Sequence, residues 1–395
     1  MKQVVIVGLG MSAATLTAEG LRAVEQADVL IGAPRLIAPF KKLNKPCFAE
    51  YTPEEVTRLI DGQEGRRFCV LVSGDTGFYS AAEGLCAALQ GYSPTLIPGV
   101  SSMSYFCARL LLPWQDAVAV SCHGHQANLV DAVRRNRLTF VLTGGNVADL
   151  GEKLTQAGFG ELTAHMGECL GGPQERILTL PVYDLAGLGV GNLAVLLVEN
   201  PVYDRRVRFG IPDEEFLRGN LPMTKSEVRA VTMSRLALSP QAVCCDIGAG
   251  TGSVTVEMAL AAYEGKVYAL DKSEEAIRLV TDNCRRFHLG NVTPVCGAAP
   301  EALEGLPPLD AGFIGGNSGR LGGIFEALLR KNPQIRLVVN AVTLETLHAA
   351  TEAFRAQAIA PEIIQVGINR ARAVGNRRIL QAGSPVFILS GGKNE

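Results

Sequence analysis

Two successive α/β domains are the fold class that this sequence predicts, and three observations lead to it. Residues 243–259 read as a short apolar strand, a turn with glycine at alternate positions and an apolar helical run, the order that opens a nucleoside-binding sheet. Residues 1–200 contain a separate set of strand–loop–helix units. Between the two sets, residues 200–212 are polar, bear prolines and cluster arginines, which is usual at a domain boundary. We therefore expect one domain over residues 1–204 and another over residues 205–395.

The composition indicates a folded cytoplasmic enzyme. The chain has 395 residues, of which 47% are hydrophobic and 19% charged, so it can build two cores and is not disordered. A net charge of −2 gives no general attraction to nucleic acid, and an anionic partner must be met by a local basic patch. We see no signal peptide and no apolar run of the ~20 residues that span a bilayer. The ten cysteines are scattered without a C-x-x-C motif, so we expect a reducing compartment and no metal site.

The first half places glycine and small polar residues directly after apolar strands. Val4–Val7 ends in Gly8 and Gly10, which is a weak signal when taken alone. Apolar strands also run into residues 73–80 and 98–102. Because such loops present backbone N–H donors, we expect a ligand cleft at the ends of these strands.

Together these loops resemble those of the tetrapyrrole methylase family, whose pattern is Gly-Asp followed by Pro-Gly-Val-Ser-Ser. Thr76 stands where most members have proline, a departure that is common in the branch that methylates C5 of the precorrin ring. Further segments that are similar to this branch are residues 121–125, 142–145, 192–194 and 199–201. The resemblance covers residues 1 to about 204. It implies a two-lobed class III methyltransferase fold that holds S-adenosylmethionine between two α/β lobes.

The same resemblance implies site residues in the first half. His123 and His125 lie in a glycine-containing loop after a strand, and we take His123 as a candidate catalytic residue. Alternatively, these histidines donate hydrogen bonds to a substrate or are structural. Positions expected to contact or floor the cofactor cleft are Gly8, Gly10, Asp75, Phe78, Ser101 and Ser102.

The second half alternates strands with helices. Such alternation predicts a mostly parallel sheet with helices on both faces, and ligands then bind at the carboxyl ends of the strands. Just before the first helix, Thr224 or Ser226 could cap it with Glu227 at the capping-box spacing, and capping alone would explain this segment. We expect strands at residues 243–247, 266–270, 291–296, 310–314, 336–340, 362–368 and 386–390. We expect helices at residues 226–237, 253–262, 273–287, 319–331 and 343–358.

The glycine turn at residues 248–252 is the most specific feature of this half. Glycine lets the backbone approach a ligand that a Cβ would push away. The spacing is G-x-G-x-G after Asp246, unlike the dinucleotide pattern G-x-G-x-x-G. Asp271 follows the next strand, where an acid suits the two ribose hydroxyls of a nucleoside. This arrangement resembles the S-adenosylmethionine loop of class I methyltransferases.

Further motifs narrow the resemblance to decarboxylating methyltransferases of corrin-ring synthesis, which act on C15 of the precorrin ring. The resemblance covers residues 205–395 and implies a Rossmann-like class I methyltransferase fold. The segments that carry it are residues 222–225, 227–229, 246–252, 299–303, 313–316 and 340–345. The cofactor contacts that we expect are Thr224, Asp246, Gly248, Ala249, Gly250, Thr251, Gly252, Asp271, Ala298 and Ala299.

The two resemblances name consecutive operations on one substrate. They imply a bifunctional enzyme of cobalamin biosynthesis that methylates precorrin-6B at C5 and C15 and decarboxylates the acetate side chain of ring C. Each domain would use one S-adenosylmethionine. A methyltransferase for RNA or for another small molecule, or a chain in which one domain only binds, is the alternative. A net charge of −2 without a basic, aromatic face argues against RNA.

A substrate with many carboxylates requires local cationic groups. Arg370 and Arg372 lie between two apolar strands near the end of the sheet, where they could face a substrate or another subunit, and we assign them to the active site. Other candidates are Arg205, Arg206, Arg208, Lys225, Arg320, Arg377 and Arg378. Because related domains self-associate, we expect a homo-oligomer, either a dimer or a tetramer. The presence of cobalt in the substrate and the order of the two methylations stay open.

Overall fold

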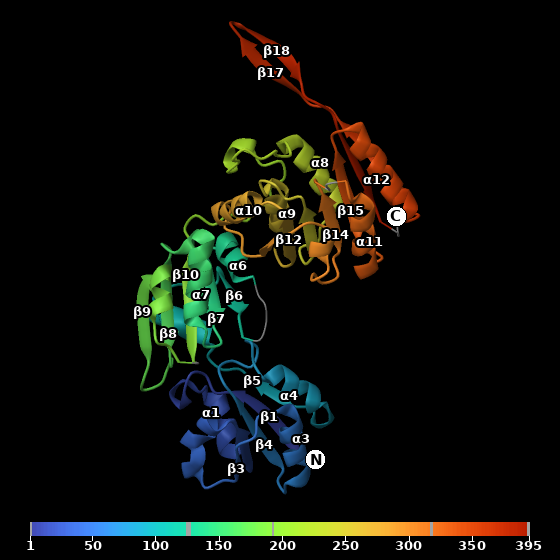
Figure 1. Cartoon of the computed structure of the whole chain (residues 1–395). Coiled ribbons are helices and arrows are strands. Elements are labelled where there is room, and N and C mark those ends of the chain that lie inside the picture. The colour runs from blue at the N-terminus through green and yellow to red at the C-terminus, as the bar shows by residue number, and fades with distance from the viewer. Residues whose placement is uncertain (1, 124–127, 192, 317–318, 393–395) are drawn as a thin grey trace. The chain divides into compact units, whose positions relative to one another are not determined.

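The computed structural model describes residues 2–123, 128–191, 193–316 and 319–392 (Figure 1). The chain forms two compact units. The first comprises Met1–Gln126, Asn136–Gly151 and Leu162–Pro201, and the second comprises Ala127–Arg135, Glu152–Glu161 and Val202–Glu395. The domain boundary that we expect at residues 204 and 205 stays a prediction. Within the described ranges no helix is both long and apolar enough to cross a membrane.

The first unit contains a parallel five-stranded sheet with the order β3-β2-β4-β1-β5. Because β1 lies between β4 and β5, the loops that follow these three strands meet at one edge. The strands are β1 (Gln3–Gly8), β2 (Val29–Gly32), β3 (Cys47–Phe48), β4 (Arg67–Val72) and β5 (Thr95–Ile97). The helices are α1 (Ala18–Gln26), α2 (Pro34–Ile37), α3 (Pro53–Gly62) and α4 (Ala82–Ala88).

A second five-stranded sheet in this unit has the order β6-β7-β10-β8-β9. Only β6 and β7 pair in parallel, and the other neighbours are antiparallel. Its strands are β6 (Ala117–Ser121), β7 (Leu138–Leu142), β8 (Thr163–Glu168), β9 (Arg176–Pro181) and β10 (Ala194–Glu199). The helices in this part of the chain are α5 (Ser102–Arg109), α6 (Leu129–Arg135) and α7 (Val147–Leu154).

The second unit is built on a seven-stranded sheet with the order β13-β12-β11-β14-β15-β19-β16. The strands β11 to β15 run parallel, and β19 pairs antiparallel with both β15 and β16. The strands are β11 (Val243–Ile247), β12 (Lys266–Asp271), β13 (Val292–Cys296), β14 (Ala311–Ile314), β15 (Arg336–Ala341), β16 (Glu362–Val366) and β19 (Val386–Gly391). The helices are α8 (Ser226–Leu236), α9 (Ser253–Ala261), α10 (Glu274–Arg286), α11 (Leu321–Lys331) and α12 (Leu344–Ala356).

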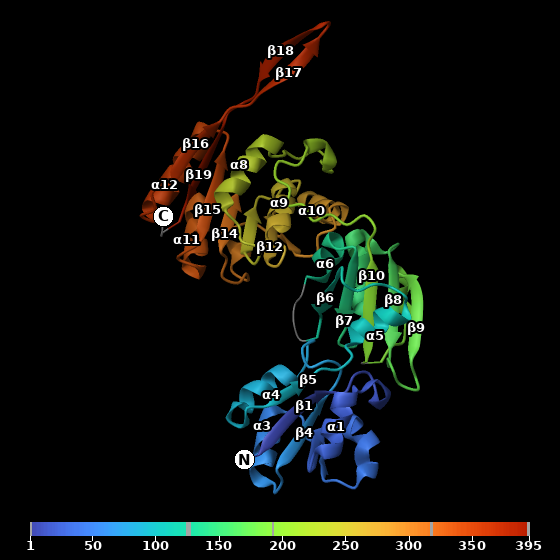
Figure 2. The same cartoon turned by 180° about the vertical axis from the view of Figure 1, so that it is seen from behind.

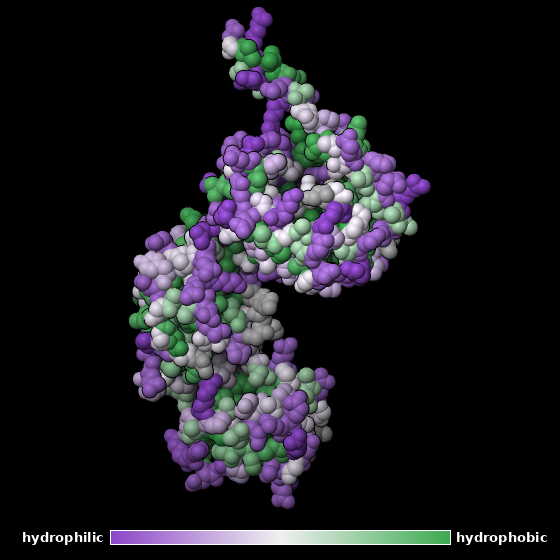
Figure 3. Space-filling view, in the orientation of Figure 1, coloured by the Kyte–Doolittle hydropathy of each residue, from purple (hydrophilic) through white to green (hydrophobic). Residues whose placement is uncertain are grey.

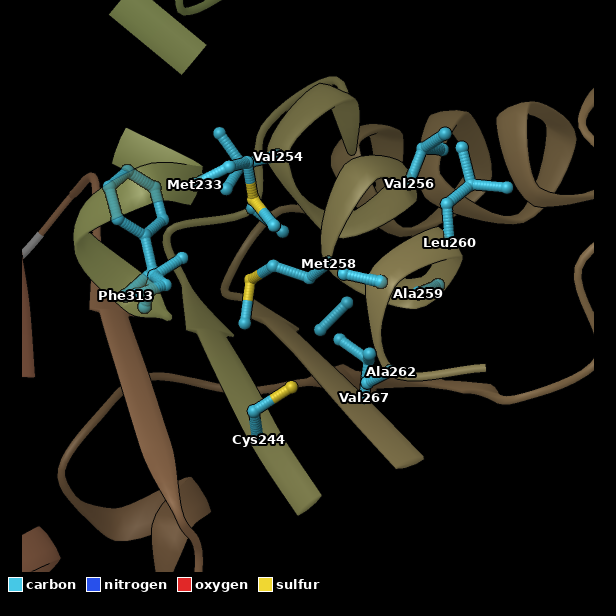
Figure 4. Packing of buried hydrophobic residues seen from close by; sticks show 14 of the residues in the cluster. Met233, Cys244, Val254, Val256, Met258, Ala259, Leu260, Ala262, Val267 and Phe313 are labelled. Atoms are coloured by element: carbon cyan, nitrogen blue, oxygen red, sulfur yellow. The ribbon is translucent and has the colours of Figure 1, made fainter. Parts of the chain in front are cut away.

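Helices cover both faces of this sheet. Each strand contributes to both contacts, because successive residues of a strand point to opposite sides. Cys244 packs with Met233 and Met258 from α8 and α9 on one face (Figure 4). Cys245 packs on the other face, in the cluster that contains Phe325 and Phe354 from α11 and α12. This three-layer arrangement confirms the strands, the helices and the mostly parallel sheet predicted for the second half.

One expectation for the second half is wrong, and one element was not expected. The helix α8 has no capping box: its N-cap is Lys225, without a side-chain cap, and Ser226 Oγ bonds to Glu227 Oε2 instead. The arginine-rich segment was not predicted to form strands, yet it folds as an antiparallel hairpin of β17 (Asn369–Val374) and β18 (Arg377–Ala382). Figures 1 and 2 show this hairpin projecting from the sheet of its unit.

A buried ion network joins the segment before α8 to the core of the second unit. The Arg229 side chain is fully buried, and its Nε donates to Glu257 Oε1 at 2.9 Å. Its Nη1 donates to Asp213 Oδ1 at 3.0 Å and to the carbonyl of Thr224, while Nη2 donates to the carbonyl of Ile211. Glu257 also accepts from the amide of Ile211 at 3.0 Å. The network therefore anchors both ends of the segment between Ile211 and Thr224.

Replacing Arg229 with alanine leaves the Glu257 carboxylate buried without its cation. We expect this change to lower the free energy of unfolding of the second unit by about 3–5 kcal/mol. The control is Arg355→Ala, whose pair with Glu352 is exposed and 3.4 Å long, and which should cost about 1 kcal/mol or less. Urea unfolding, with hydrogen exchange in β11 to assign the transition, measures both. Equal losses in the two variants would contradict this role.

Candidate active sites

The second unit contains a cavity of about 840 Å³ at the carboxyl ends of its parallel strands. From β11 the sheet continues through β12 on one side and through β14 on the other, so the order of strands reverses here. Ligands of open α/β sheets bind at such a reversal, in cavities of about 300–1,000 Å³. The cavity therefore lies at the carboxyl ends of the strands, where the sequence predicts a ligand-binding site.

The turn between β11 and α9 forms one wall of this cavity. Its glycines Gly248, Gly250 and Gly252 have positive φ of 77°, 55° and 75°. A Cβ on Gly248 would lie 2.6 Å from the Cα of Gly316, so the two loops approach more closely than any side chain allows. Gly248, Ala249, Gly250 and Thr251 line the cavity. Gly252 does not line it and instead is the N-cap of α9.

Asp246, at the end of β11, is fully buried beside the cavity. The hydroxyl of Thr255 donates to its Oδ2 at 2.5 Å. Neither Asp246 Oδ1 nor Thr251 Oγ1 has a hydrogen-bond partner among the described residues. Burial raises the pKa of Asp246 to about 7, and the nearby Asp271 carboxylate adds to the shift. Because unpartnered buried polar atoms are costly, both atoms are suited to polar groups of a ligand.

Asp271, at the end of β12, holds the glycine turn in place. Its Oδ2 accepts from the amide of Gly250 at 3.0 Å, and its Oδ1 accepts from the amide of Ser273 at 2.9 Å. The sequence does not reveal these bonds. Each carboxylate oxygen has two lone pairs, so Asp271 keeps acceptor capacity toward the cavity that it lines. Its contact with ribose hydroxyls stays a prediction.

Cations also line this cavity. Thr224, Ala298 and Ala299 line it as expected, and so do the candidate cations Arg370 and Lys225. The Nη2 atom of Arg370 lies 2.6 Å from Glu227 Oε2, and this bond holds the pKa of Glu227 at about 2. Arg372 does not line the cavity and lies further out on the exposed hairpin.

Most other candidate cations already have acidic partners. Acids within 4 Å are Asp204 for Arg206, Glu215 for Arg208, Asp213 for Lys225 and Glu301 for Arg320. The Nε atom of Arg205 donates to the carbonyl of Arg135. An acidic partner does not exclude a cation from binding a substrate, because Arg370 is itself paired with Glu227. The roles of all these cations stay predictions.

The first unit contains a cavity of about 1440 Å³ between its two sheets. Phe78, Ser102 and His123 line it, as the sequence suggests. The ring of His123 lies against the Gly144 backbone, because a Cβ on Gly144 would be 3.0 Å from His123 Nδ1. Within the described ranges the imidazole has no hydrogen-bond partner, so its catalytic role stays a prediction. His125 and Asn192 lie outside the described residues.

The other residues of the first half that we expect at the cofactor cleft lie in loops that border this cavity. A Cβ on Gly99 would lie 2.3 Å from the Gly74 carbonyl oxygen and 2.5 Å from that of Gly8. Asp75 ties the loops together, because its Oδ1 accepts from the amide of Gly77 at 2.8 Å and its Oδ2 from that of Gly99 at 3.0 Å. Residues that do not themselves line the cavity are Gly8, Gly10, Asp75 and Ser101.

Several lining residues were missed by the sequence analysis. Arg35 and Glu83 bring charges to the cavity of the first unit. The sequence pattern that could have indicated Arg35 is the helix start at Pro34, after β2. In the second unit, Ile368 and residues 381–384 line the cavity from both ends of the hairpin. The sequence pattern that could have indicated a loop at this cavity is the Gly383-Ser384 pair between apolar segments.

Known proteins are similar to both halves of the chain. Residues 3–186 match the family model of tetrapyrrole (corrin/porphyrin) methylases, and residues 215–393 match that of a precorrin methyltransferase domain. A precorrin-6Y C(5,15)-methyltransferase (decarboxylating) from Sinorhizobium sp is 30% identical over 394 residues, which are 96% of this chain and 94% of that protein. A probable cobalt-precorrin-6B C(15)-methyltransferase (decarboxylating) from Pyrobaculum calidifontis is 41% identical over 184 residues, 46% of this chain and 94% of that protein. The crystal structure of precorrin-6y C5,15-methyltransferase from Geobacter metallireducens GS-15 is 36% identical, covers 47% of this chain and 96% of that chain, and has a TM-score of 0.45.

The fold, the cavities and these matches define an S-adenosylmethionine-dependent methyltransferase with a tetrapyrrole-methylase domain and a Rossmann-like class I domain. Because the similarity extends over nearly all of both sequences, the chain belongs to the family of decarboxylating precorrin-6Y C5,15-methyltransferases. The expected fold class and enzyme class are confirmed.

The Asp246 carboxyl should make the stability of the second unit depend on pH. Its pKa of about 7 in the folded chain lies above the ordinary value of 3.8, so the folded state loses stability as pH rises between these values. The neutral variant Asp246→Asn avoids this loss. We expect it to be more stable than the parent at pH 8, by on the order of a few kcal/mol, with the difference vanishing near pH 4. Urea unfolding across this pH range measures it, and a difference independent of pH would refute the assignment.

Proposed function

We propose that the chain is the bifunctional methyltransferase of cobalamin biosynthesis that converts precorrin-6B to precorrin-8. The first domain methylates C5, and the second methylates C15 and removes carbon dioxide from the acetate side chain of ring C. The observation that carries the proposal is a pair of cavities, each bounded by a glycine turn at the carboxyl ends of parallel strands, in one chain of this family.

The residues of the second unit fit S-adenosylmethionine. The cofactor carries an ammonium and a sulfonium group, and the cavity offers the carboxylates of Asp246 and Asp271. Asp246 Oδ1 and Thr251 Oγ1 are the buried polar atoms without partners that a bound methionine group would satisfy. The glycine turn would meet this group with its backbone, and Ala298 and Ala299 leave room for the adenine. When bound, the cofactor supplies an electrophilic methyl group.

The chemistry at C15 makes modest demands on the protein. Loss of carbon dioxide leaves an electron pair that the conjugated ring delivers to the meso carbon, so no side chain has to remove a proton there. The protein must hold the ring so that the reacting atoms are about 3–3.5 Å apart and must exclude water. Arg370, at the mouth of the cavity, is placed to hold a carboxylate side chain of the ring.

Replacing Arg370 with alanine should weaken binding of precorrin-6B about tenfold, because a charge-assisted hydrogen bond contributes about 1.5–3 kcal/mol. The affinity for S-adenosylhomocysteine should not change, since Arg370 lies at the mouth and not at the glycine turn. Calorimetry with each ligand measures both affinities, and Arg355→Ala is the control. If the two ligands lose affinity equally, Arg370 is not a substrate-binding residue.

If each domain binds one cofactor, each chain should bind two molecules of S-adenosylhomocysteine. Gly99→Ala should remove one, because its Cβ would lie 2.3 Å from the Gly74 carbonyl oxygen. Gly248→Ala should remove the other, because its Cβ would lie 2.6 Å from Gly316. Titration calorimetry of the parent and both variants counts the sites. A single site in the parent chain would rule out two methylating domains and favour one domain that only binds.

The remaining expectations stay predictions. They are a dimer or tetramer, a cytoplasmic location, the absence of a nucleic-acid partner and the absence of a structural metal. Sedimentation velocity of the full chain measures the first of these.

A further inference from the structure

The loop between β8 and β9 lies between the two lobes of the first unit, each of which is built on one of its five-stranded sheets. The loop leaves the second sheet at Cys169, whose amide donates to the carbonyl of Leu193 at 3.0 Å. A Cβ on Gly171 would lie 2.5 Å from the Cβ of Met11, which follows β1 in the first sheet. Figure 3 shows a recess in the surface between these lobes. Residues 169–174 therefore connect the lobes, and we call them the bridge loop.

The bridge loop forms part of the cavity wall in this unit. Cys169 has a positive φ of 51°, a conformation that costs free energy for a residue with a side chain. Such a conformation persists only where surrounding contacts enforce it, and it is concentrated at functional sites. The loop therefore needs an anchor. Its residues that line the cavity are Cys169, Leu170, Gly172, Pro173 and Gln174.

Glu175 supplies this anchor at the end of the loop. Its Oε2 accepts from the amide of Gly171 at 2.7 Å and from the hydroxyl of Tyr105 at 2.8 Å. Its Oε1 lies 3.0 Å from Nη2 of Arg109. Tyr105 and Arg109 belong to α5, which packs into the core of the second lobe through Phe106. The hydrogen bond to the carboxylate raises the pKa of the Tyr105 hydroxyl. One carboxylate thus joins the loop to a helix that is itself fixed.

We propose that Glu175 is a positioning residue of the first active site, where it holds the bridge loop in place as a wall around the cofactor. The inference rests on the function proposed above, because the ligand is the S-adenosylmethionine of the C5 transfer. Neither Glu175 nor Tyr105 lines the cavity, so both act through the loop and do not touch the ligand. Without the carboxylate the Gly171 amide loses its acceptor, and binding must then also order the loop.

The test uses the full chain carrying Gly248→Ala, which should leave the first site as the one that binds S-adenosylhomocysteine. In this background Glu175→Ala should raise the dissociation constant about tenfold, because ordering the loop opposes binding. Glu175→Gln should restore most of the affinity, since the amide oxygen of glutamine has two lone pairs and can accept from both Gly171 and Tyr105. Tyr105→Phe removes one of the two bonds and should raise the constant about threefold. Titration calorimetry measures all of them.

Asp28→Ala is the matched control for a loss of stability alone. Asp28 Oδ2 accepts from the amides of Arg66 and Arg67 at 2.8 and 2.9 Å, so this variant also removes a carboxylate that holds backbone groups. Asp28 precedes β2, at the edge of the sheet opposite the cavity. The control should be less stable than its parent in urea unfolding and should bind S-adenosylhomocysteine with the parent's affinity.

The outcomes separate this inference from the function on which it rests. If the Gly248→Ala parent binds no S-adenosylhomocysteine, the first unit has no cofactor site and both fall together. If the parent binds and Glu175→Ala binds as tightly, or Asp28→Ala loses as much affinity, the role of Glu175 alone is overturned. Should Glu175→Ala not fold, Tyr105→Phe decides, because an unchanged affinity in that variant would contradict the anchor.

Discussion

Close approach between backbones at the ends of parallel strands is the constraint on which both cavities depend. In the second unit Gly248 lies against Gly316, and in the first unit the loops of Gly8, Gly74 and Gly99 meet in the same way. A single Cβ at the contact would separate these loops. The glycines therefore do more than permit turns, because they let the loops that border each cavity come together. The two folds are unrelated in strand order, yet both reach this arrangement.

Charge is distributed along the second site in a way that the net charge of −2 conceals. Deep in the cavity are two acids, Asp246 and Asp271, which suit a cationic cofactor. Arg370 and Lys225 line the same cavity and bring positive charge to it. Groups of both signs in one cavity would favour a cationic and an anionic ligand at different places, because like charges brought together cost free energy. The buried pair of Arg229 and Glu257 helps to hold the cavity wall in place, since Arg229 donates a hydrogen bond to the carbonyl of Thr224 in that wall.

The sequence predicts the architecture of the second half well, because buried strands and amphipathic helices alternate there and short-range patterns suffice. It does not predict the hairpin, whose strands lack the alternation of buried and exposed residues that marks a half-buried strand. It also misplaces the cap of α8, because the segment before the helix is fixed by the distant Glu257 through Arg229. The bonds of Asp75 to Gly99 and of Asp271 to Gly250 join loops that are separated in the chain, so composition and spacing indicate the acids but not their partners. Cys296 is exposed at the end of the edge strand β13, although small thiols are usually buried.

The most direct test is a crystal structure of the full chain grown with excess S-adenosylhomocysteine. The account predicts one molecule in each unit, with its methionine group against Gly248–Thr251 in the second and near Phe78 in the first. It also predicts that the ammonium group lies within hydrogen-bond distance of Asp246 Oδ1. Density in only one unit, or side chains filling the other cavity, would contradict the claim that one chain carries two methyl-transfer sites.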